Sequence, residues 1–278
     1  MKFEVKKDRI VLPKVKEFNS RQILECGQMF RYFICDEYAQ VYSCDKTAKI
    51  IEKSDKIEII SPNPEYFVKF FDLETDYEKI KNDLKSDQIL KKVIPFGEGI
   101  RICKNDIIEV MFSFVISANN NIPRIKKIIE NLCKFGKKCD GFNAFPTLEE
   151  LKELPLEVYS SLGAGYRDKY LFKLSRVLTR ELIFDKMNLE TNELRNWLVS
   201  LPGIGPKVAD CILLFGFSRM DCFPVDTWVS KIYEKFYYQG EKTRPMIAKF
   251  FVDRFKQNAG YAQQYLFYGA RSNEFLKV

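Results

Sequence analysis

The sequence predicts an α+β protein, in which an N-terminal antiparallel β-sheet domain precedes a mainly α-helical region that contains a helix-hairpin-helix. Alternating apolar and polar residues, with β-branched and aromatic side chains, dominate the chain up to about residue 60. Apolar residues at helical spacing dominate after Ser61-Pro62-Asn63-Pro64. We therefore expect a sheet domain over residues 1–62 and a helical region over residues 63–278, with the helix-hairpin-helix at about 191–216.

The first 60 residues contain several strand signals and one helix. The helix is expected over residues 20–26, because Asn19 or Ser20 can cap its start and Gly27 can end it. Short polar turns separate the strand-like segments, which is typical of an antiparallel meander. The expected strands begin at residues 3 and 10 and continue at 29–35, 38–44, 48–52 and 57–60.

Beyond residue 62 we expect helices only, since Gly- and Pro-containing loops separate segments of helical periodicity. Thr147 and Glu150 form the pattern of a capping box for one of them. The expected helices lie near residues 64–71, 76–85, 87–94, 105–118, 122–134, 147–154, 156–162, 167–181, 191–199, 207–216, 227–238, 243–257 and 261–272.

Composition limits the chemistry that this chain can perform. The chain has 278 residues, a formal net charge of +7 and no histidine. The positive charge suits a polyanionic partner without requiring one, and the lack of histidine excludes imidazole bases, Ser-His-Asp triads and HExxH zinc sites. Catalysis must therefore use lysine, carboxylate, cysteine or tyrosine.

Sequence features also indicate an intracellular protein, in the cytoplasm or nucleoid if the source is prokaryotic. No run of 18 apolar residues occurs and the N-terminus lacks a secretion signal, so no membrane partner is expected. The eight cysteines include no CxxC pair, and we expect them to be reduced and mostly buried.

The stretch from Leu201 to Trp228, LPGIGPKVADCILLFGFSRMDCFPVDTW, combines a hairpin, a lysine and a carboxylate. Its glycines and prolines prevent a helix over residues 201–206, and Pro206 then favours a first helical turn. Lys207 and Cys211, four residues apart, share one face of the helix that follows. Asp226 is placed to cap a further helix. Taken singly, the lysine could be a surface residue, the aspartate only a cap, and the hairpin an ordinary connection.

Taken in order, this hairpin, Lys207 two residues later and Pro-Val-Asp at 224–226 resemble the helix-hairpin-helix-Gly-Pro-Asp superfamily of DNA glycosylases. Some members of the superfamily carry an iron-sulfur cluster whose cysteines follow the catalytic aspartate. No cysteine follows Cys222 here, so no such cluster is expected.

Four further stretches are similar to the 8-oxoguanine DNA glycosylases of the eukaryotic type. In chain order they are CGQMFR from Cys26, FVISANNNIPR from Phe114, GAGYR from Gly163 and YAQQYLF from Tyr261. That branch also adds an N-terminal sheet. With the 201–228 stretch, these matches span nearly the whole chain.

The resemblance implies a bifunctional enzyme, a DNA N-glycosylase with DNA-(apurinic or apyrimidinic site) lyase activity. It would extrude 8-oxoguanine from duplex DNA, because the bond to be broken is inaccessible inside the stack. Lys207 would attack C1′ and form a Schiff base that permits β-elimination, and Asp226 would stabilise the positive charge on the sugar.

The resemblance also assigns binding residues. Gly27, Cys211, Gln263 and Phe267 would bind the lesion, with the Gly27 carbonyl accepting the N7 proton that guanine lacks. The residues that would fill the gap and read the orphaned base are Asn119, Arg124, Tyr166 and Arg167. Amides at Gly203, Gly205 and Lys207 would hold a phosphate. Carbonyl groups near Val199, Leu201 and Ile204 could hold a structural cation, and no catalytic metal or cofactor is expected.

The implied partner is duplex DNA that carries 8-oxoguanine, preferably opposite cytosine, and the protein is expected to be a monomer. One departure is Trp228, where eukaryotic members have histidine; an indole N–H can still donate one hydrogen bond. Two alternatives stay open, a glycosylase for alkylated purines and a helix-hairpin-helix protein that binds DNA without catalysis.

Overall fold

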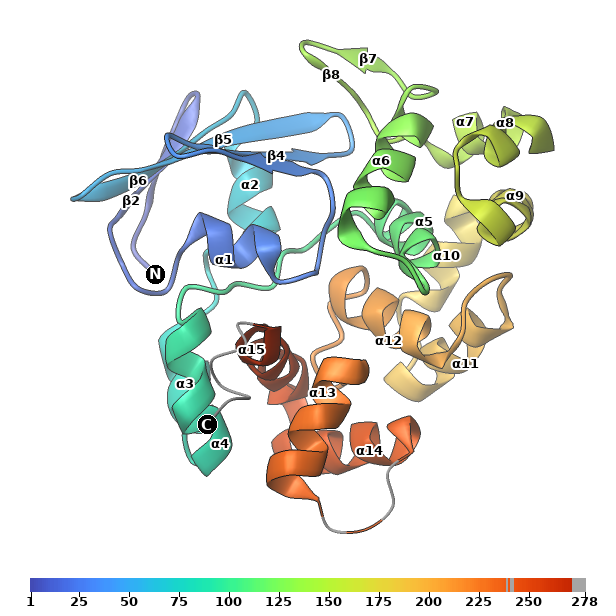
Figure 1. Cartoon of the computed structure of the whole chain (residues 1–278). Helices are drawn as coiled ribbons and strands as arrows, with labels where there is room; N and C mark the ends of the chain where they lie inside the picture. Colours follow the sequence, from blue (N-terminus) through green and yellow to red (C-terminus); the bar gives the residue numbers. More distant parts are fainter. Residues whose placement is uncertain (239, 241–242, 272–278) are drawn as a thin grey trace.

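A six-stranded antiparallel sheet occupies the start of the chain in the computed structural model, which describes residues 1–238, 240 and 243–271 (Figure 1). Its strand order is β1-β2-β6-β5-β4-β3, so β2 and β6 pair although more than 40 residues separate them along the chain. The strands are β1 (Glu4–Lys6), β2 (Arg9–Pro13), β3 (Tyr32–Ile34), β4 (Ala39–Ser43), β5 (Lys46–Glu52) and β6 (Lys56–Ile60). The sheet followed by helices confirms the predicted fold class.

Helices α1 (Ser20–Glu25) and α2 (Pro64–Phe70) cover one face of this sheet and lie below it in Figure 1. Alternate strand residues such as Ile10 and Leu12 bury their side chains against them. Asn19 caps α1 as expected, since its Oδ1 accepts from the amide of Gln22 at 2.9 Å. Because α2 belongs to the sheet's core, the domain division at residue 62 stays a prediction.

The chain crosses between two hydrophobic cores at the segment that follows α1. Met29 is buried in the core of the sheet, whereas Cys26 and Phe30 are buried in the core of the helical region. A strand was expected over residues 29–35, but β3 begins only at Tyr32. The crossing explains the difference, because Met29 and Phe30 are drawn into separate cores instead of extending along a sheet.

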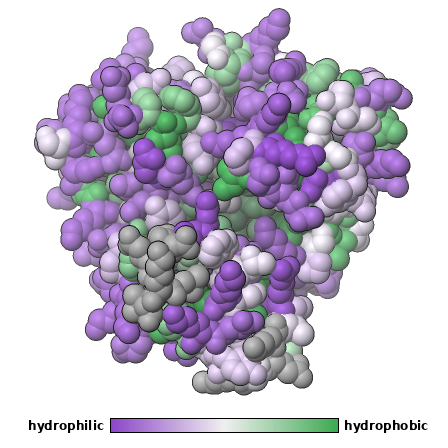
Figure 2. Space-filling view, viewed as in Figure 1, coloured by the Kyte–Doolittle hydropathy of each residue, from purple (hydrophilic) through white to green (hydrophobic). Residues whose placement is uncertain are grey.

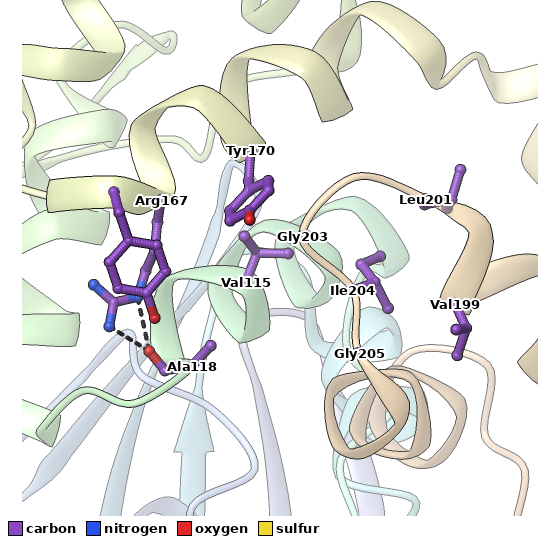
Figure 3. A pocket seen from close by; sticks show the side chains of 10 residues that line it. Val115, Ala118, Arg167, Tyr170, Val199, Leu201, Gly203, Ile204 and Gly205 are labelled. Atoms are coloured by element: carbon purple, nitrogen blue, oxygen red, sulfur yellow. Dashed lines mark hydrogen bonds between the residues drawn. The ribbon is translucent and has the colours of Figure 1, made fainter.

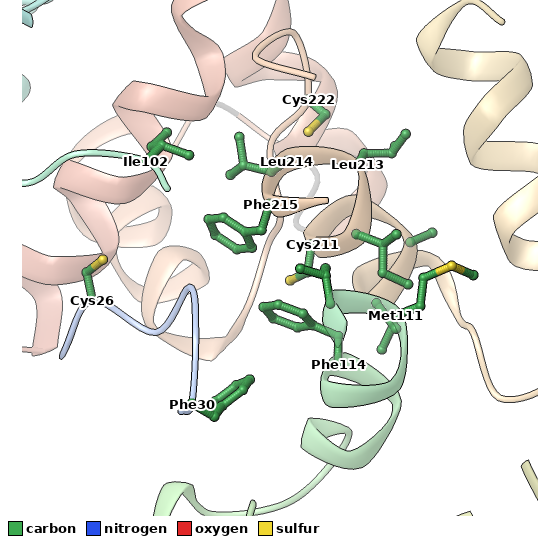
Figure 4. Packing of buried hydrophobic residues seen from close by; sticks show 14 of the residues in the cluster. Cys26, Phe30, Ile102, Met111, Phe114, Cys211, Leu213, Leu214, Phe215 and Cys222 are labelled. Atoms are coloured by element: carbon green, nitrogen blue, oxygen red, sulfur yellow. The ribbon is translucent and has the colours of Figure 1, made fainter. Parts of the chain in front are cut away.

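Helices α5 and α12 form the centre of the helical region, and both are buried along most of their length. The larger helical core packs around them and includes Phe114 of α5 and Phe215 of α12 (Figure 4). The helices are α3 (Tyr77–Leu84), α4 (Gln88–Val93), α5 (Ile107–Ser117), α6 (Ile122–Cys133), α7 (Leu148–Glu153), α8 (Leu156–Ser161), α9 (Asp168–Val177), α10 (Arg180–Lys186), α11 (Thr191–Ser200), α12 (Pro206–Phe215), α13 (Thr227–Ile232), α14 (Arg244–Phe255) and α15 (Ala259–Arg271). A π-helical turn, Tyr233–Tyr237, follows α13 directly.

The expectation of helices only beyond residue 62 was wrong at one place. A small hairpin, β7 (Lys138–Cys139) and β8 (Phe142–Asn143), lies between α6 and α7. Asp140-Gly141 forms its turn, and Gly141 has φ of 76°. Asp-Gly is a strong hairpin signal because glycine tolerates this left-handed conformation.

The helix expected over residues 167–181 is in fact interrupted. It ends at Val177, and the backbone of Leu178 and Thr179 is extended before α10 begins. Thr179 caps α10, its side-chain oxygen accepting from the amide of Leu182 at 3.0 Å, so the threonine favours a new helix start over continuation. The capping box at Thr147 is present as expected. The expected end of the last helix at residue 272 lies outside the described residues.

No helix within the described ranges has the length and apolar character that a bilayer-crossing segment needs.

Candidate active site and nucleic-acid interface

Two glycines shape the hairpin between α11 and α12. One lets the hairpin pack closely against its neighbour, and the other leaves the N-terminus of α12 accessible. Gly203 has φ of 78°, and a Cβ built on it would come within 2.7 Å of the Tyr170 Cβ, so glycine lets the hairpin pack against α9. Gly205 is the N-cap of α12, is exposed, and has no side chain capping the helix. The first amides of α12 therefore remain uncapped by protein side chains, which is the arrangement that binds anions at helix N-termini.

Lys207 lies on the first turn of α12, half-buried against aromatic rings. Its Nζ is 5.7 Å from the centre of the Phe114 ring. Phe114 in turn stacks on Phe215 at 5.5 Å and meets the edge of Phe30 at 5.6 Å (Figure 4). The Lys207 amine therefore lies beside an apolar surface of packed aromatic rings.

Cys211, one turn further along α12, is 3% exposed. Burial raises the pKa of the Cys211 thiol, the positive charge of Lys207 opposes this shift, and the negative charges of Asp210 and Asp226 add to it. The lysine, the thiol and the carboxylate thus share one electrostatic environment.

Asp226 is the N-cap of α13, as the sequence predicted. Its Oδ1 accepts from the amides of Trp228 at 3.0 Å and Val229 at 2.9 Å. Both capping bonds use the same oxygen, so the cap does not occupy Oδ2. A capping role and a role toward a ligand are therefore compatible in one side chain.

Gly27 and Phe267 meet although 240 positions separate them. A Cβ on Gly27 would lie 3.0 Å from Phe267 Cε1, and Gly27 has φ of +80°. Both the close approach and the left-handed backbone require glycine here. Arg271 lies over the same ring, with its Cζ 5.5 Å from the ring centre.

Two polar residues that follow Gly27 anchor this segment to the rest of the molecule, and the sequence alone assigned no role to either of them. Gln28, which is buried, accepts from the amide of Cys103 at 2.7 Å and donates to the carbonyl of Arg101 at 2.8 Å. Arg31 donates to Glu130 at 3.1 Å and to the carbonyl of Asn143 at 2.6 Å. Both lie within CGQMFR, so their presence in a stretch that resembles the family was the signal that the sequence offered.

Gln263 lies on α15 with 4% of its surface exposed. Its Oε1 accepts from Nε2 of the adjacent Gln264 at 2.9 Å. Gln263 and Phe267 are four residues apart and so share a face of α15. The four residues expected to contact the lesion therefore lie on three elements: this face of α15, helix α12 and the segment at Gly27.

The residues expected to face the opposite base project from loops and helix starts. Asn119 is exposed and has φ of 49°, which is uncommon for a residue other than glycine. Arg124 is exposed and donates to the carbonyl of Gly163 at 3.0 Å. Tyr166 is 59% exposed. These three side chains can reach another molecule without rearrangement of a core.

Arg167 differs from them, because it is only 4% exposed. Its guanidinium donates to the carbonyl of Ala118 at 2.7 Å (Figure 3). It also donates to the carbonyls of Asn119 and Ala164, at 2.8 Å and 3.0 Å. These bonds hold the end of α5 where the backbone turns at Asn119. The structure therefore places Arg167 beneath the Asn119 loop, and direct contact with a base stays a prediction.

Two cavities flank the hairpin. One of about 420 Å³ lies between it and Tyr166 and Tyr170 (Figure 3). Exposed Val199, half-buried Leu201 and buried Ile204 line this cavity. The other, of about 870 Å³, includes Lys207 among its lining residues, together with Arg195, Arg244 and Lys249.

Hydrophilic side chains cover most of the face seen in Figure 2, with smaller hydrophobic groups between them. In the part of the chain that the structure describes, no group of three or more Cys, Asp or Glu side chains could hold a metal ion.

Two family models match consecutive parts of the chain. The N-terminal domain of 8-oxoguanine DNA glycosylase matches residues 10–111. The HhH-GPD superfamily of base excision DNA repair proteins matches residues 112–257. Together they span most of the chain, and the second begins within α5.

Solved and curated relatives agree with these matches. The chain is 37% identical to the Clostridium acetobutylicum 8-oxoguanine glycosylase/lyase, solved in complex with double-stranded DNA containing cytosine opposite 8-oxoguanine, with 98% of each chain covered and a TM-score of 0.91. It is 31% identical over 255 residues to an N-glycosylase/DNA lyase of Saccharomyces cerevisiae, spanning 77% of this chain and 67% of that protein. It is 34% identical over 201 residues to the N-glycosylase/DNA lyase OGG1 of Arabidopsis thaliana, spanning 64% of this chain and 55% of that protein.

Proposed function

Because this chain belongs to the HhH-GPD superfamily of base excision DNA repair proteins, and within it to the 8-oxoguanine DNA glycosylases, we propose that it excises 8-oxoguanine from duplex DNA through Lys207. One observation carries the assignment of the site. Lys207 lies in the first turn of a helix that no side chain caps, Asp226 caps the next helix through one carboxylate oxygen alone, and the charges of both residues shift the pKa of the buried Cys211 thiol. A protein that only bound DNA would need neither the lysine nor the carboxylate at this place.

Lys207 is the nucleophile in this proposal. The neutral amine donates its lone pair to C1′, the C1′–N9 bond breaks, and the base leaves with the bonding electrons and takes up a proton. Loss of the amine's protons and opening of the sugar ring give a Schiff base. Abstraction of a proton from C2′ then expels the 3′ phosphate, which is the lyase step.

Asp226 stabilises the positive charge that develops on the sugar as the base departs. Its Oδ1 is held by two amide donors, which fixes the carboxylate, and Oδ2 is left for the site. A pre-oriented charge costs no reorganisation when the transition state forms. The cap therefore supports the chemical role.

The base is recognised by the residues around Gly27. The carbonyl of Gly27 accepts the N7 proton of 8-oxoguanine, whereas guanine would present a lone pair there. Cys211 and Phe267 stack on the two faces of the base, and Gln263 contacts its Watson–Crick edge. Cys211 and Gln263 are almost completely buried, and Phe267 is half-buried, so movement of Phe267 admits the base.

Asn119, Arg124 and Tyr166 occupy the gap in the duplex and contact the orphaned cytosine. The guanidinium of Arg124 has donors only, which suit the O2 and N3 acceptors of cytosine. The amides of Gly203, Gly205 and Lys207, at the start of a helix that no side chain caps, hold a phosphate of the extruded strand.

The reaction in this proposal needs no cofactor and no iron-sulfur cluster, since a lysine and a carboxylate suffice. Carbonyl groups at Val199, Leu201 and Ile204 suit a structural cation, because the C-terminus of α11 carries partial negative charge. A DNA substrate also implies an intracellular location, and we propose that the protein acts as a monomer.

Borohydride trapping on a duplex with one 8-oxoguanine tests the proposal. Reduction of the Schiff base should yield a covalent protein–DNA adduct, and its yield should follow base release. The same duplex with guanine at that position should give no adduct. Base release without any adduct would contradict the lysine mechanism, and the absence of both would contradict the substrate.

A further inference from the structure

Two adjacent glutamines on α15 are both buried and bonded to each other. Gln263 is 4% exposed and Gln264 is 2% exposed. Nε2 of Gln264 donates to Oε1 of Gln263 at 2.9 Å. Within the described residues, Oε1 of Gln264 is buried and accepts no hydrogen bond. The bond to Gln263 is therefore the interaction that the Gln264 amide makes.

A role in filling space does not explain Gln264. Burying an amide whose oxygen lacks a partner destabilises the folded protein, and an unbranched apolar side chain such as methionine would fill the same volume without that cost. The hydrogen bond to Gln263 is what an apolar residue could not supply.

That bond determines which way the amide of Gln263 faces. Rotation about the last side-chain bond exchanges the oxygen, an acceptor, with the nitrogen, a donor. With Gln264 donating, the oxygen of Gln263 stays on the side of Gln264. Rotation by half a turn would set two N–H donors against each other.

Orientation matters because purines differ at this edge. A 6-oxopurine presents an acceptor at O6 and a donor at N1, whereas a 6-aminopurine presents a donor at N6 and an acceptor at N1. An amide that rotates freely can satisfy either pattern. With its oxygen held by Gln264, Gln263 offers its nitrogen, a donor, which suits the O6 acceptor of a 6-oxopurine and opposes the N6 donor of a 6-aminopurine.

We propose that Gln264 is a positioning residue that holds the amide of Gln263 in one orientation, so that the pocket selects 6-oxopurine lesions over 6-aminopurine lesions. The inference rests on the proposed function, in which Gln263 contacts the base. Gln264 then affects substrate specificity through Gln263, without touching the substrate itself.

The test compares single-turnover excision of 8-oxoguanine and of 8-oxoadenine, each placed opposite cytosine. The wild-type protein should strongly favour 8-oxoguanine. Gln264→Met keeps the volume and removes the donor, and it should reduce the ratio of the two rates about fivefold to tenfold, as expected for one lost hydrogen bond. Because both rates come from the same preparation, a partly unfolded sample leaves the ratio unaffected.

Gln264→Glu gives a signature that a structural role would not. The ionised carboxylate only accepts hydrogen bonds and would attract Nε2 of Gln263, turning the amide around. The protonated carboxyl can still donate as the glutamine does. The preference for 8-oxoguanine should therefore fall as pH rises through the titration of that carboxyl, and the wild-type ratio should not follow this course.

Tyr265→Phe is the matched control. The Tyr265 hydroxyl lies on the same helix and is likewise buried without a hydrogen-bond partner among the described residues. It therefore makes no hydrogen bond to Gln263, and its removal should leave the ratio unchanged. An unchanged ratio in Gln264→Met and Gln264→Glu, with wild-type activity on 8-oxoguanine intact, would overturn the inference alone. A wild-type protein inactive on 8-oxoguanine would overturn the proposed function. If Gln264→Met fails to fold, Gln264→Glu decides the matter.

Discussion

The part of the site that we propose binds the lesion and the part that we propose meets the opposite strand are built in different ways. Gly27, Cys211 and Gln263 lie among buried side chains of two cores, fixed by packing and by bonds such as those of Gln28. Arg124 and Tyr166 stand on the surface.

The difference follows from what each side has to meet. A base that has left the stack must be distinguished by one proton, which requires a rigid, water-poor pocket. The intact strand keeps its own structure, so the side chains that contact it need only extend from the protein surface and do not have to form a closed pocket. Substitutions on the lesion side should therefore combine losses of activity and stability, whereas those on the opposite side should alter preference at little cost in stability.

Lys207→Gln should produce the largest effect, because an amide cannot attack C1′. We expect base release to fall by at least about 10³-fold and borohydride trapping to disappear, while the duplex is still bound. Rates and trapped adduct are measured together. Lys249→Gln, at a lysine that lines the same 870 Å³ cavity, is the control and should remain active. An adduct that persists in Lys207→Gln would identify another nucleophile.

Asp226→Asn should slow base release by about 10²- to 10³-fold, since the charge that stabilises the sugar cation is lost. The amide oxygen can still accept from Trp228 and Val229, so the melting temperature should change little. Asp106→Asn, at the N-cap of α5, controls for capping alone. A fall in melting temperature with a normal rate would reduce Asp226 to a cap.

Arg167→Ala tests the comparison most directly. Sequence similarity assigns this arginine to the opposite strand, whereas its burial places it among the residues that support the fold. Its loss leaves the carbonyls of Ala118, Asn119 and Ala164 without their donor. We expect unfolding free energy to fall by about 2–4 kcal/mol, measured by denaturant titration. Unchanged stability together with an altered opposite-base preference would make Arg167 a direct reader of the strand.

Arg124→Ala should have the smallest effect on the fold and a specific effect on preference. Adenine opposite the lesion presents an N6 donor to an arginine donor, which costs on the order of 1–3 kcal/mol, so the wild type should prefer cytosine by about tenfold or more. Arg124→Ala should shrink this ratio more than it lowers activity opposite cytosine, with stability within about 0.5 kcal/mol. Equal wild-type rates opposite both bases would remove the basis for the comparison.

Local signals predicted much of the fold. Prolines and glycines located the hairpin before Lys207, helical spacing located α12, and strand alternation located most of the sheet. The pairing of β2 with β6 depends on contacts between residues far apart in the sequence, which no local pattern encodes. The sequence did not predict the break before α10, because Thr179 lies within a longer stretch of helical spacing. It did not predict the β7–β8 hairpin, because Asp140-Gly141 lies within a longer loop.

Residue type and order were enough to identify the expected site residues, but the burial and hydrogen bonding of each residue could not be predicted from them. Nothing in the sequence separates Arg124, on the surface, from Arg167, under the Asn119 loop, since both are arginines beside polar loops. Nor does it show that Gln264 bonds to Gln263, because neighbours on a helix point in different directions. Burial and orientation depend on the packed structure.

The contact between Gly27 and Phe267 links residues near opposite ends of the chain, and this bears on how the enzyme is made. Such a contact closes a long loop, and its entropic cost has to be offset by the packing of the elements that it brings together. The sheet and the helix that carries Lys207 precede α15 in the chain, so synthesis completes them before α15 can dock. In the proposed function, the nucleophile is therefore made before the residues that select the base.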